Sequence, residues 1–171
     1  DEYRFSDAVK QALAGRDVGH LLDIATGTGR MLKIAGPLAE SGVGIDLSKK
    51  MVMVARNALA EADLPHLTVR QEDMYQMRFP ARHFDTVTID QVLYFASNPD
   101  ALIKEATRVL KPHGRLLLVA FTEAVQAKTP PSVGIAISDI QHWLEEAGLK
   151  ITATNVPVSY THLTLPTNRE V

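Results

Sequence analysis

The stretch that decides the fold runs from His20 to Arg30 and reads His-Leu-Leu-Asp-Ile-Ala-Thr-Gly-Thr-Gly-Arg. Its first half is a mostly apolar run that contains an acid, and its second half is rich in glycine. A second short run, residues 43–46 (Val-Gly-Ile-Asp), closes on Asp46. A strand, a glycine-rich turn, a helix and an acid at the tip of the next strand together predict a βαβ unit of the nucleoside-binding kind.

The glycine-rich loop departs from the fingerprint of dinucleotide-binding proteins. That fingerprint, G-x-G-x-x-G, needs its third glycine for close packing of the helix. Leu32 stands at that position after Gly27 and Gly29, and a count that begins at Ala25 places Arg30 there instead. A glycine-rich turn on its own also occurs as a tight connection between a strand and a helix, so that structural interpretation stays open.

The remaining pattern, Asp23-x-Ala25-x-Gly27-x-Gly29, resembles motif I of class I S-adenosylmethionine-dependent methyltransferases, in which alanine often replaces the first glycine. The resemblance implies that this loop binds the cofactor through Asp23, Ala25, Thr26, Gly27 and Gly29. Glycines let the backbone approach a ligand without a Cβ, and Asp46 can accept hydrogen bonds from both ribose hydroxyls. Because this cofactor carries a sulfonium and an ammonium instead of a pyrophosphate, we expect acids to dominate near it.

The resemblance continues beyond motif I and covers about residues 21–156. Residues 44–56 are similar to the segment that follows motif I. This similarity implies that Leu47 and Met51 contact the cofactor, with Met51 against the adenine. The alternative for Met51 is a methionine of the hydrophobic core.

Two later segments carry further candidate residues. Residues 71–74 resemble the segment after the third strand, which implies that Asp73 meets the adenine amino group and that the amide of Met74 meets a ring nitrogen. The alternative for Asp73 is the cap of a turn. Residues 84–93 resemble the fourth strand and its tip, which implies that Asp90 lies near the sulfonium.

Within this superfamily, residues 90–95 and the helix after Pro99 resemble the ubiquinone and menaquinone methyltransferase branch, including fusions to an ArsR-type regulator. Those fusions usually carry histidines where Asp90 and Tyr94 stand. The resemblance implies methyl transfer from S-adenosylmethionine to a small-molecule acceptor. A noncatalytic sensor domain of a regulator and, less favoured, an NAD-dependent oxidoreductase are the alternatives. No residue is assigned as catalytic. Tyr94 and Glu123 would lie near the acceptor, but Tyr94 is interpreted as a packing residue and Glu123 as a solvated loop acid.

Composition sets limits on the function. The 171 residues are enough for one domain with a real core. A net charge of −2 with no basic block gives no support for nucleic-acid binding by this domain. The absence of cysteine excludes disulfides and thiolate zinc sites, and no metal site is predicted. No apolar stretch approaches the roughly 20 residues that span a bilayer, and a cytoplasmic location is expected.

Helix and strand signals alternate along the chain. The predicted strands are 21–25, 43–46, 67–70, 84–90, 115–121 and 149–156, and the predicted helices are 6–14, 31–39, 48–59, 98–110 and 138–147. We expect Ser6, Ser48 and Asn98 to cap helices, and Gly36-Pro37 to bend one. This alternation predicts an α/β fold, a doubly wound and mostly parallel Rossmann-like sheet with helices on both faces. The resemblance adds the strand order 3-2-1-4-5-7-6.

The two ends of the chain look unlike the rest. The sequence begins Asp-Glu-Tyr, close to the first helix, so we expect the methyltransferase domain, residues 1–157, to lack upstream sequence that could include a DNA-binding module. Residues 158–171 resemble translated sequencing-adapter read-through, which implies that the native seventh strand is absent. The tail is β-prone, so it is expected to occupy the vacant position in the sheet and to stop at Pro166.

Overall fold

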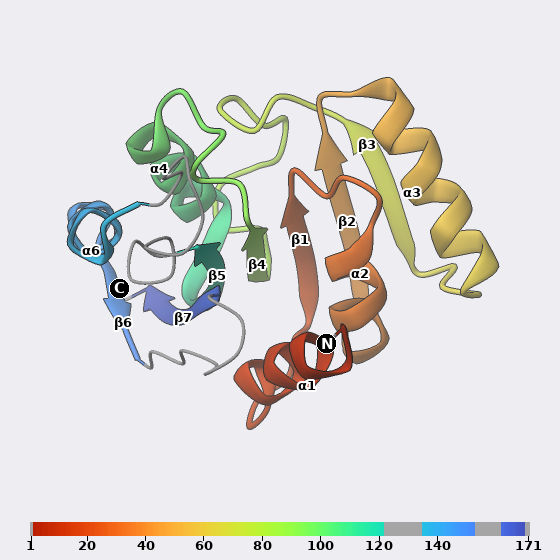
Figure 1. The fold of residues 1–171 in the computed structure, drawn as a ribbon, viewed down its shortest axis with the longest axis horizontal. Helices are drawn as coiled ribbons and strands as arrows, with labels where there is room; N and C mark the ends of the chain where they lie inside the picture. The colour runs from red at the N-terminus through yellow and green to blue at the C-terminus, as the bar shows by residue number, and fades with distance from the viewer. Residues whose placement is uncertain (1, 122–134, 153–161, 170–171) are drawn as a thin grey trace, which may run out of the picture.

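A computed structural model describes residues 2–121, 135–152 and 162–169 of the chain (Figure 1). The strands are β1 (His20–Ile24), β2 (Ser41–Asp46), β3 (Leu67–Gln71), β4 (Phe84–Asp90), β5 (Leu110–Phe121), β6 (Leu149–Ile151) and β7 (His162–Arg169). The helices are α1 (Glu2–Leu13), α2 (Arg30–Ala35), the 3₁₀ turn η1 (Gly36–Leu38), α3 (Lys49–Glu61), α4 (Pro99–Val109) and α6 (Ile137–Glu146).

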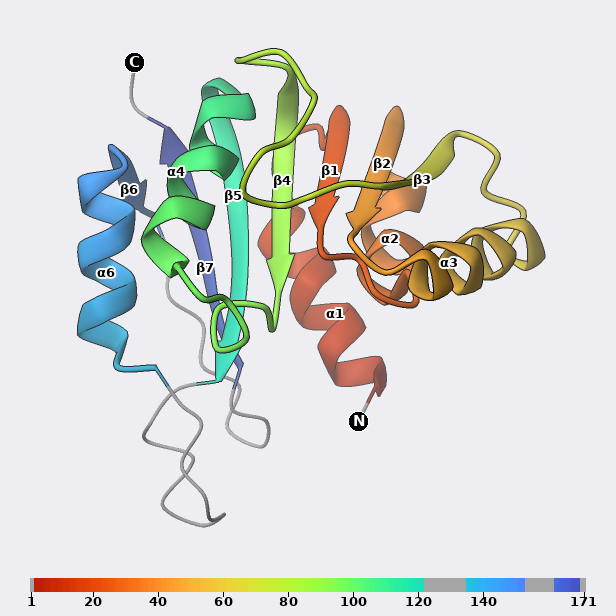
Figure 2. The ribbon, with the colours of Figure 1, turned by 90° about the horizontal axis from the view of Figure 1, so that it is seen from above.

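The seven described strands form one sheet in the order β3-β2-β1-β4-β5-β7-β6 (Figure 2). The first five in chain order pair in parallel, and β7 runs antiparallel between β5 and β6. Apolar side chains of α1, α2 and α3 pack on one face of the sheet, while those of α4 and α6 pack on the other. The predicted doubly wound fold and its strand order are confirmed.

The local signals that depend on neighbouring residues are confirmed. Ser48 accepts a hydrogen bond from the amide of Met51, and Asn98 accepts one from the amide of Ala101, so both cap their helices as expected. The helix after the glycine loop ends at Ala35 and gives way to η1 at Gly36, where the bend was predicted. Strand β4 has the predicted bounds, and most other elements agree within two residues.

The predicted start of the first helix is wrong. Helix α1 begins at Glu2, and Ser6 lies within it instead of capping it. The reason is that Phe5 packs against the core one turn before Val9, and Leu13 follows one turn later. The apolar stripe on the helix therefore extends a turn further toward the N-terminus than the capping signal indicated.

The predicted start of the fifth strand is also wrong. Residues 111–114, which separate the predicted helix from the predicted strand, lie inside β5, which begins at Leu110. Leu110 pairs with Phe84, and the regular register resumes at Thr86 opposite Arg115. The residues between form an irregularity in which His113 adopts a left-handed φ of 62°. Pairing with β4 on both sides of the irregularity keeps the segment in the sheet.

The chain end occupies the sheet position that was expected for it, but Pro166 does not stop the strand. β7 continues to Arg169, and Pro166 pairs with Leu117 of β5. The pairing of β7 with β6 begins only at Thr167, which faces Ile151. Pro166 thus stands where the described ladder has a partner on one side only, a position where a residue without an N–H is tolerated. For β6, residues 153–156 of the predicted strand lie outside the described residues.

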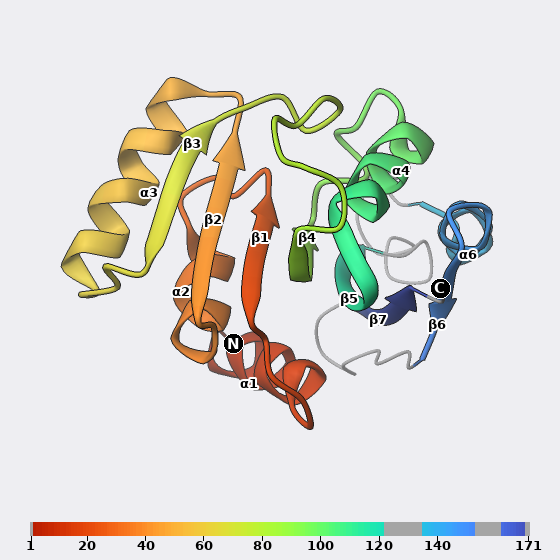
Figure 3. The same cartoon turned by 180° about the vertical axis from the view of Figure 1, so that it is seen from behind.

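No helix connects β3 to β4; residues 72–83 form an irregular loop of turns and bends (Figure 3). Arg108 of α4 holds this segment in place. Its guanidinium donates to the carbonyl of Phe79 at 2.9 Å and to that of Met77 at 3.0 Å, and it pairs with Glu105 at 2.7 Å. The hydrogen bond from Arg108 holds the pKa of the Glu105 carboxyl below its ordinary value.

We expect Arg108→Met to lower the free energy of unfolding by roughly 1–2 kcal/mol, because two carbonyls and one carboxylate lose their donor. The expected loss of unfolding free energy is small because the Arg108 side chain is 37% exposed and water screens its charge. Urea unfolding would measure the change. The control Lys104→Met removes an exposed ion pair from the same helix and should leave stability unaltered. Equal effects of the two variants would contradict the anchoring role of Arg108.

Candidate functional site

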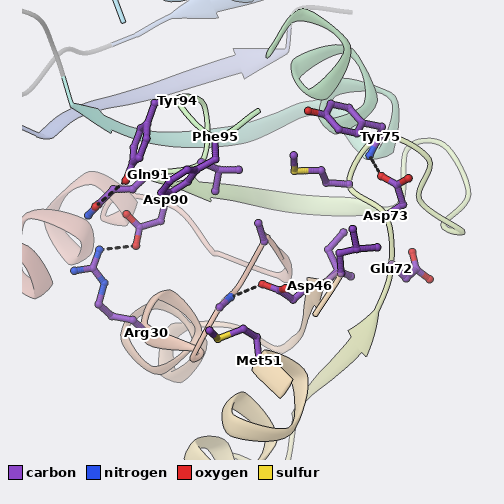
Figure 4. A pocket seen from close by; sticks show the side chains of 16 residues that line it. Arg30, Asp46, Met51, Glu72, Asp73, Tyr75, Asp90, Gln91, Tyr94 and Phe95 are labelled. Atoms are coloured by element: carbon purple, nitrogen blue, oxygen red, sulfur yellow. Dashed lines mark hydrogen bonds and ion pairs between the residues drawn. The ribbon is translucent and has the colours of Figure 1, made fainter. Parts of the chain in front are cut away.

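A pocket of about 630 Å³ opens at the carboxyl ends of the central strands, where the strand order reverses between β1 and β4 (Figure 4). In open α/β sheets this is the place where ligands bind. Its lining comes from the ends of β1, β2, β3 and β4 and the loops that follow them: Ala25, Gly27, Arg30, Ile45, Asp46, Leu47, Met51, Glu72, Asp73, Met74, Tyr75, Asp90, Gln91, Val92, Tyr94 and Phe95.

The glycine-rich loop forms the pocket wall after β1. Ala25, Gly27 and Gly29 have φ values of 54°, 55° and 85°, in the left-handed region that favours glycine. The amide of Thr26 donates to the carbonyl of Ile45 at 2.8 Å, which fixes the loop against β2. The loop therefore turns sharply and presents its backbone at Gly27 to the pocket.

Asp46 connects this loop to the second strand. Its Oδ2 accepts a hydrogen bond from the amide of Gly27 at 2.9 Å, and its Oδ1 accepts one from the amide of Ser48 at 2.9 Å. A carboxylate oxygen has two lone pairs, so each oxygen keeps a further acceptor position. The carboxylate is thus held rigidly in the pocket with capacity for two more donors.

Asp73 caps a turn and also lines the pocket. Its Oδ1 accepts a hydrogen bond from the amide of Tyr75 at 2.9 Å. The hydroxyl of Tyr75 shares a hydrogen bond with Ser97 and accepts another from the amide of Asn98. The segments after β3 and β4 are thereby tied together at the pocket.

Met51 and Leu47 border the pocket from α3 and the turn before it. Met51 is 37% exposed and Leu47 is 69% exposed, so neither belongs to the core. Met74 also lines the pocket and packs against the core cluster. The pocket therefore offers apolar side chains on the side of β2 and β3, next to the carboxylates of Asp46 and Asp73.

Asp90 and Arg30 form the opposite end of the pocket. Asp90 Oδ2 accepts from Arg30 Nη2 at 2.7 Å, while its buried Oδ1 has no hydrogen-bond partner in the described part of the chain. The guanidinium of Arg30 also lies over the ring of Phe5, 4.1 Å from its centre. The residue after Asp90, Gln91, has a left-handed φ of 59°, and such strained backbone is concentrated at functional sites.

The aromatic pair Tyr94 and Phe95 completes this end. Their ring centres lie 4.3 Å apart, and Phe95 is 77% exposed. Burial, followed by the negative charge of Asp90, raises the pKa of Tyr94 above its ordinary value. The sequence favoured a packing role for Tyr94, whereas in the structure Tyr94 lines the pocket. Glu123, the other acceptor-side residue considered, lies outside the described residues.

Three of the predicted cofactor residues do not line the pocket. Asp23 is 1% exposed and accepts hydrogen bonds from Thr26 Oγ1 at 2.6 Å and Thr88 Oγ1 at 2.7 Å. A Cβ at Gly29 would lie 3.4 Å from the Cβ of Ala55, so this glycine serves the packing of the loop on α3. The contacts of these three residues are with the interior of the domain, so Asp23, Thr26 and Gly29 stabilise the loop without lining the pocket.

The other predicted residues converge on the pocket: Ala25, Gly27, Asp46, Leu47, Met51, Asp73, Met74 and Asp90. Sequence reasoning did not assign Arg30, Ile45, Glu72, Tyr75, Gln91, Val92, Tyr94 or Phe95 to the site. Most of these residues are adjacent in sequence to predicted site residues, and this proximity was the one feature of the sequence that could have indicated them. In the described ranges no helix is long and apolar enough to cross a membrane, and no cluster of metal-binding side chains occurs.

Comparisons with known proteins agree with this geometry. The family model described as a methyltransferase domain matches residues 22–118. The ubiquinone/menaquinone biosynthesis C-methyltransferase UbiE of Saccharophagus degradans is 36% identical over 121 residues, which are 67% of this chain and 48% of that protein. The chain thus spans about half the length of the curated relatives that it matches.

Solved structures share the fold over nearly the whole chain. A SAM-dependent methyltransferase from Aquifex aeolicus has a TM-score of 0.81 and 21% identity, covering 96% of this chain and 89% of that one. The cyclase SpnF has a TM-score of 0.83 and 21% identity, covering 98% and 80%. Because a cyclase shares this fold, the fold alone does not assign the reaction. The matched family model does identify the family: the chain belongs to the methyltransferase domain family.

Proposed function

We propose that the pocket binds S-adenosylmethionine and that the protein transfers its methyl group to a small-molecule acceptor. The observation that carries this proposal is the charge of the lining: the carboxylates of Asp46, Asp73 and Asp90 outnumber the one guanidinium, that of Arg30. Glu72 also lines the pocket, but its carboxylate is paired with Arg78. Arg30 is already paired with Asp90. A cationic sulfonium and ammonium are attracted to this lining, whereas the pyrophosphate of a dinucleotide is repelled by it.

The parts of the cofactor match successive parts of the lining. The two free acceptor positions of Asp46 suit the ribose hydroxyls. The apolar surface of Met51 and Met74, next to Asp73, suits an adenine ring with its amino group. The Oδ1 oxygen of Asp90, which has no hydrogen-bond partner in the described residues, suits the positive charge of the sulfonium group. The order along the pocket thus follows the order of groups in the nucleoside.

The sulfonium supplies an activated methyl group, so the protein needs to contribute chiefly alignment and exclusion of water. The rigid loop at Gly27, held by Asp46, fixes the donor side. The hydrogen bond from the amide of Asn98 to the hydroxyl of Tyr75 joins two loops, and these loops fix the side of the pocket where the methyl acceptor would bind. A general base is required only where the acceptor must lose a proton.

For the acceptor, we infer a flat, largely apolar molecule of the quinone class. The rings of Tyr94 and Phe95, together with Val92, give the open end of the pocket an aromatic and apolar surface. Such surfaces favour stacking of planar ligands. The relatives named for ubiquinone and menaquinone biosynthesis support the same class.

Calorimetry with S-adenosylhomocysteine and with NAD tests the cofactor. We expect measurable binding of S-adenosylhomocysteine and negligible binding of NAD, and a preference for NAD would refute the proposal. Incubation with S-adenosylmethionine and a demethylated quinol then tests turnover. Cofactor binding without turnover of any small molecule would favour the alternative of a noncatalytic sensor.

We expect Asp46→Ala to weaken S-adenosylhomocysteine binding by roughly 1.5–3 kcal/mol, because the ribose loses charge-assisted acceptors. The amides of Gly27 and Ser48 also lose their acceptor, which loosens the loop. The control Glu61→Ala removes an exposed acid from the end of α3, outside the pocket, and should bind like the parent protein. If Asp46→Ala binds S-adenosylhomocysteine with unchanged affinity, Asp46 has a structural role only and does not bind the ribose.

A further inference from the structure

A second cavity of about 640 Å³ lies between α1, α2 and η1, on the outer side of Arg30. This cavity is distinct from the cofactor pocket and is of similar size. Arg30 lines both cavities, so a molecule in this α1–α2 groove would lie one side chain away from the cofactor. The groove therefore has a position from which it can contribute to ligand binding.

The charges in the α1–α2 groove are unbalanced. Its lining includes the cations Lys10, Lys33 and Arg30, and the acid Glu2. Arg30 is paired with Asp90 and stacked on Phe5, whereas neither lysine ammonium has a hydrogen bond or ion pair within the described residues. Two ammonium groups are thus available to an anion.

Apart from Ser6, the rest of the groove is lined by apolar or aromatic side chains. Ile34, Pro37 and Leu38 line it from α2 and η1, and Tyr3 lines it from α1. Tyr3 is 85% exposed and Leu38 is 48% exposed, which leaves large apolar side chains open to water. Exposed apolar side chains that line a cavity together with cations are a feature of binding sites.

We propose that the α1–α2 groove binds a small amphiphilic anion, an apolar body that carries a carboxylate or phosphate headgroup. The apolar body covers Tyr3, Ile34 and Leu38, and the headgroup meets the ammonium groups of Lys10 and Lys33. A free inorganic anion would leave the apolar wall exposed, and an uncharged apolar molecule would leave the ammonium groups without a partner. The site goes beyond the proposed methyl transfer, and only the blocking of the first pocket in the test below rests on that proposed function.

Calorimetric titration with octanoate, octyl phosphate and octanol tests the groove, with each probe below its micelle concentration. The protein is saturated with S-adenosylhomocysteine, so that the probe does not enter the cofactor pocket. We expect at least one of the two anions to bind at least tenfold more tightly than octanol, and its affinity to fall as salt rises. The probe that binds identifies the headgroup as a carboxylate or a phosphate. Equal affinity for octanol, or no binding of either anion, would overturn the proposal.

The double variant Lys10→Gln with Lys33→Gln should lower the affinity for the bound anion about tenfold, since each exposed ion pair contributes modestly. Its matched control, Lys50→Gln with Lys104→Gln, removes the same charge from outside the groove and should bind like the parent protein. Both variants should keep their circular dichroism and their affinity for S-adenosylhomocysteine. Undiminished anion binding by the groove variant would contradict the assignment. Because S-adenosylhomocysteine is titrated separately, failure of the groove is distinguishable from failure of the cofactor proposal.

Discussion

Gly27→Val is expected to lower the affinity for S-adenosylhomocysteine at least 100-fold while leaving the fold intact. Gly27 lines the pocket, and a Cβ placed on it meets no protein atom within 4 Å. The added side chain would therefore project into the pocket without displacing the core. A 100-fold loss corresponds to about 2.7 kcal/mol, which the exclusion of a ligand in contact with the backbone easily reaches.

The variant also carries a backbone cost, because the φ of Gly27 is 55°. Gly15→Val is the matched control. Gly15 has a φ of 88°, equally open space around its Cβ position and a place in the turn after α1, away from the pocket. Both variants should lose roughly 1–2 kcal/mol of stability in urea unfolding. Only Gly27→Val should lose binding in calorimetry; equal binding by the two would show that the pocket does not hold the cofactor at this loop.

The second large effect concerns Asp23 and pH. Burial raises the pKa of the Asp23 carboxyl to about 7, against hydrogen bonds from Thr26 and Thr88 that lower it. The folded state therefore holds a proton that the unfolded chain, with its ordinary pKa of 3.8, has released. By linkage this group makes the protein lose stability as pH rises from about 4 to about 7, by up to about 1.4 kcal/mol per pH unit. Above pH 7 the loss is complete.

Asp23→Asn isolates this contribution, because the carboxamide stays neutral and the threonine hydroxyls can rotate to donate or accept. Relative to the parent protein, the variant should gain roughly 2–3 kcal/mol between pH 5 and pH 7 in urea unfolding. Asp85→Asn is the control. The hydrogen bonds that Asp85 accepts from His20 and Lys111 lower its pKa, against the effect of burial, so its stabilisation is lost only in acid. A pH-independent difference between parent and Asp23→Asn would refute the buried proton.

Much of the fold follows from local patterns in the sequence. The run of residues 21–25 predicted β1, because a strand buried on both faces needs mostly apolar side chains. The alternation of Val87 and Ile89 with threonines predicted β4. Asn98 and Pro99 predicted the start of α4, because capping involves only residues within one turn. The glycines at 27 and 29 predicted a sharp turn, because few other residues adopt a positive φ at low cost.

The predictions failed where distant segments decide the structure. The early start of α1 depends on Phe5 reaching the core, and the continuation of β5 through His113 depends on pairing with β4. Pro166 is tolerated because β6 pairs only with later residues of β7. None of these partners is close in sequence, so capping and turn signals could not reveal them.

In the candidate site too, some features follow from the sequence and others from contacts between distant segments. By itself the sequence determined the residue types of the site, a glycine loop and acids at strand tips, since parallel strands bring their carboxyl ends to one edge. Only the tertiary structure decided that Arg30 pairs with Asp90, 60 residues away, and that Tyr75 bonds the loop before α4. It also decided that Asp23 turns inward to two threonines and away from the pocket. The physical reason is that a side chain's direction and partners depend on how separate elements pack, and that packing is set by the whole core.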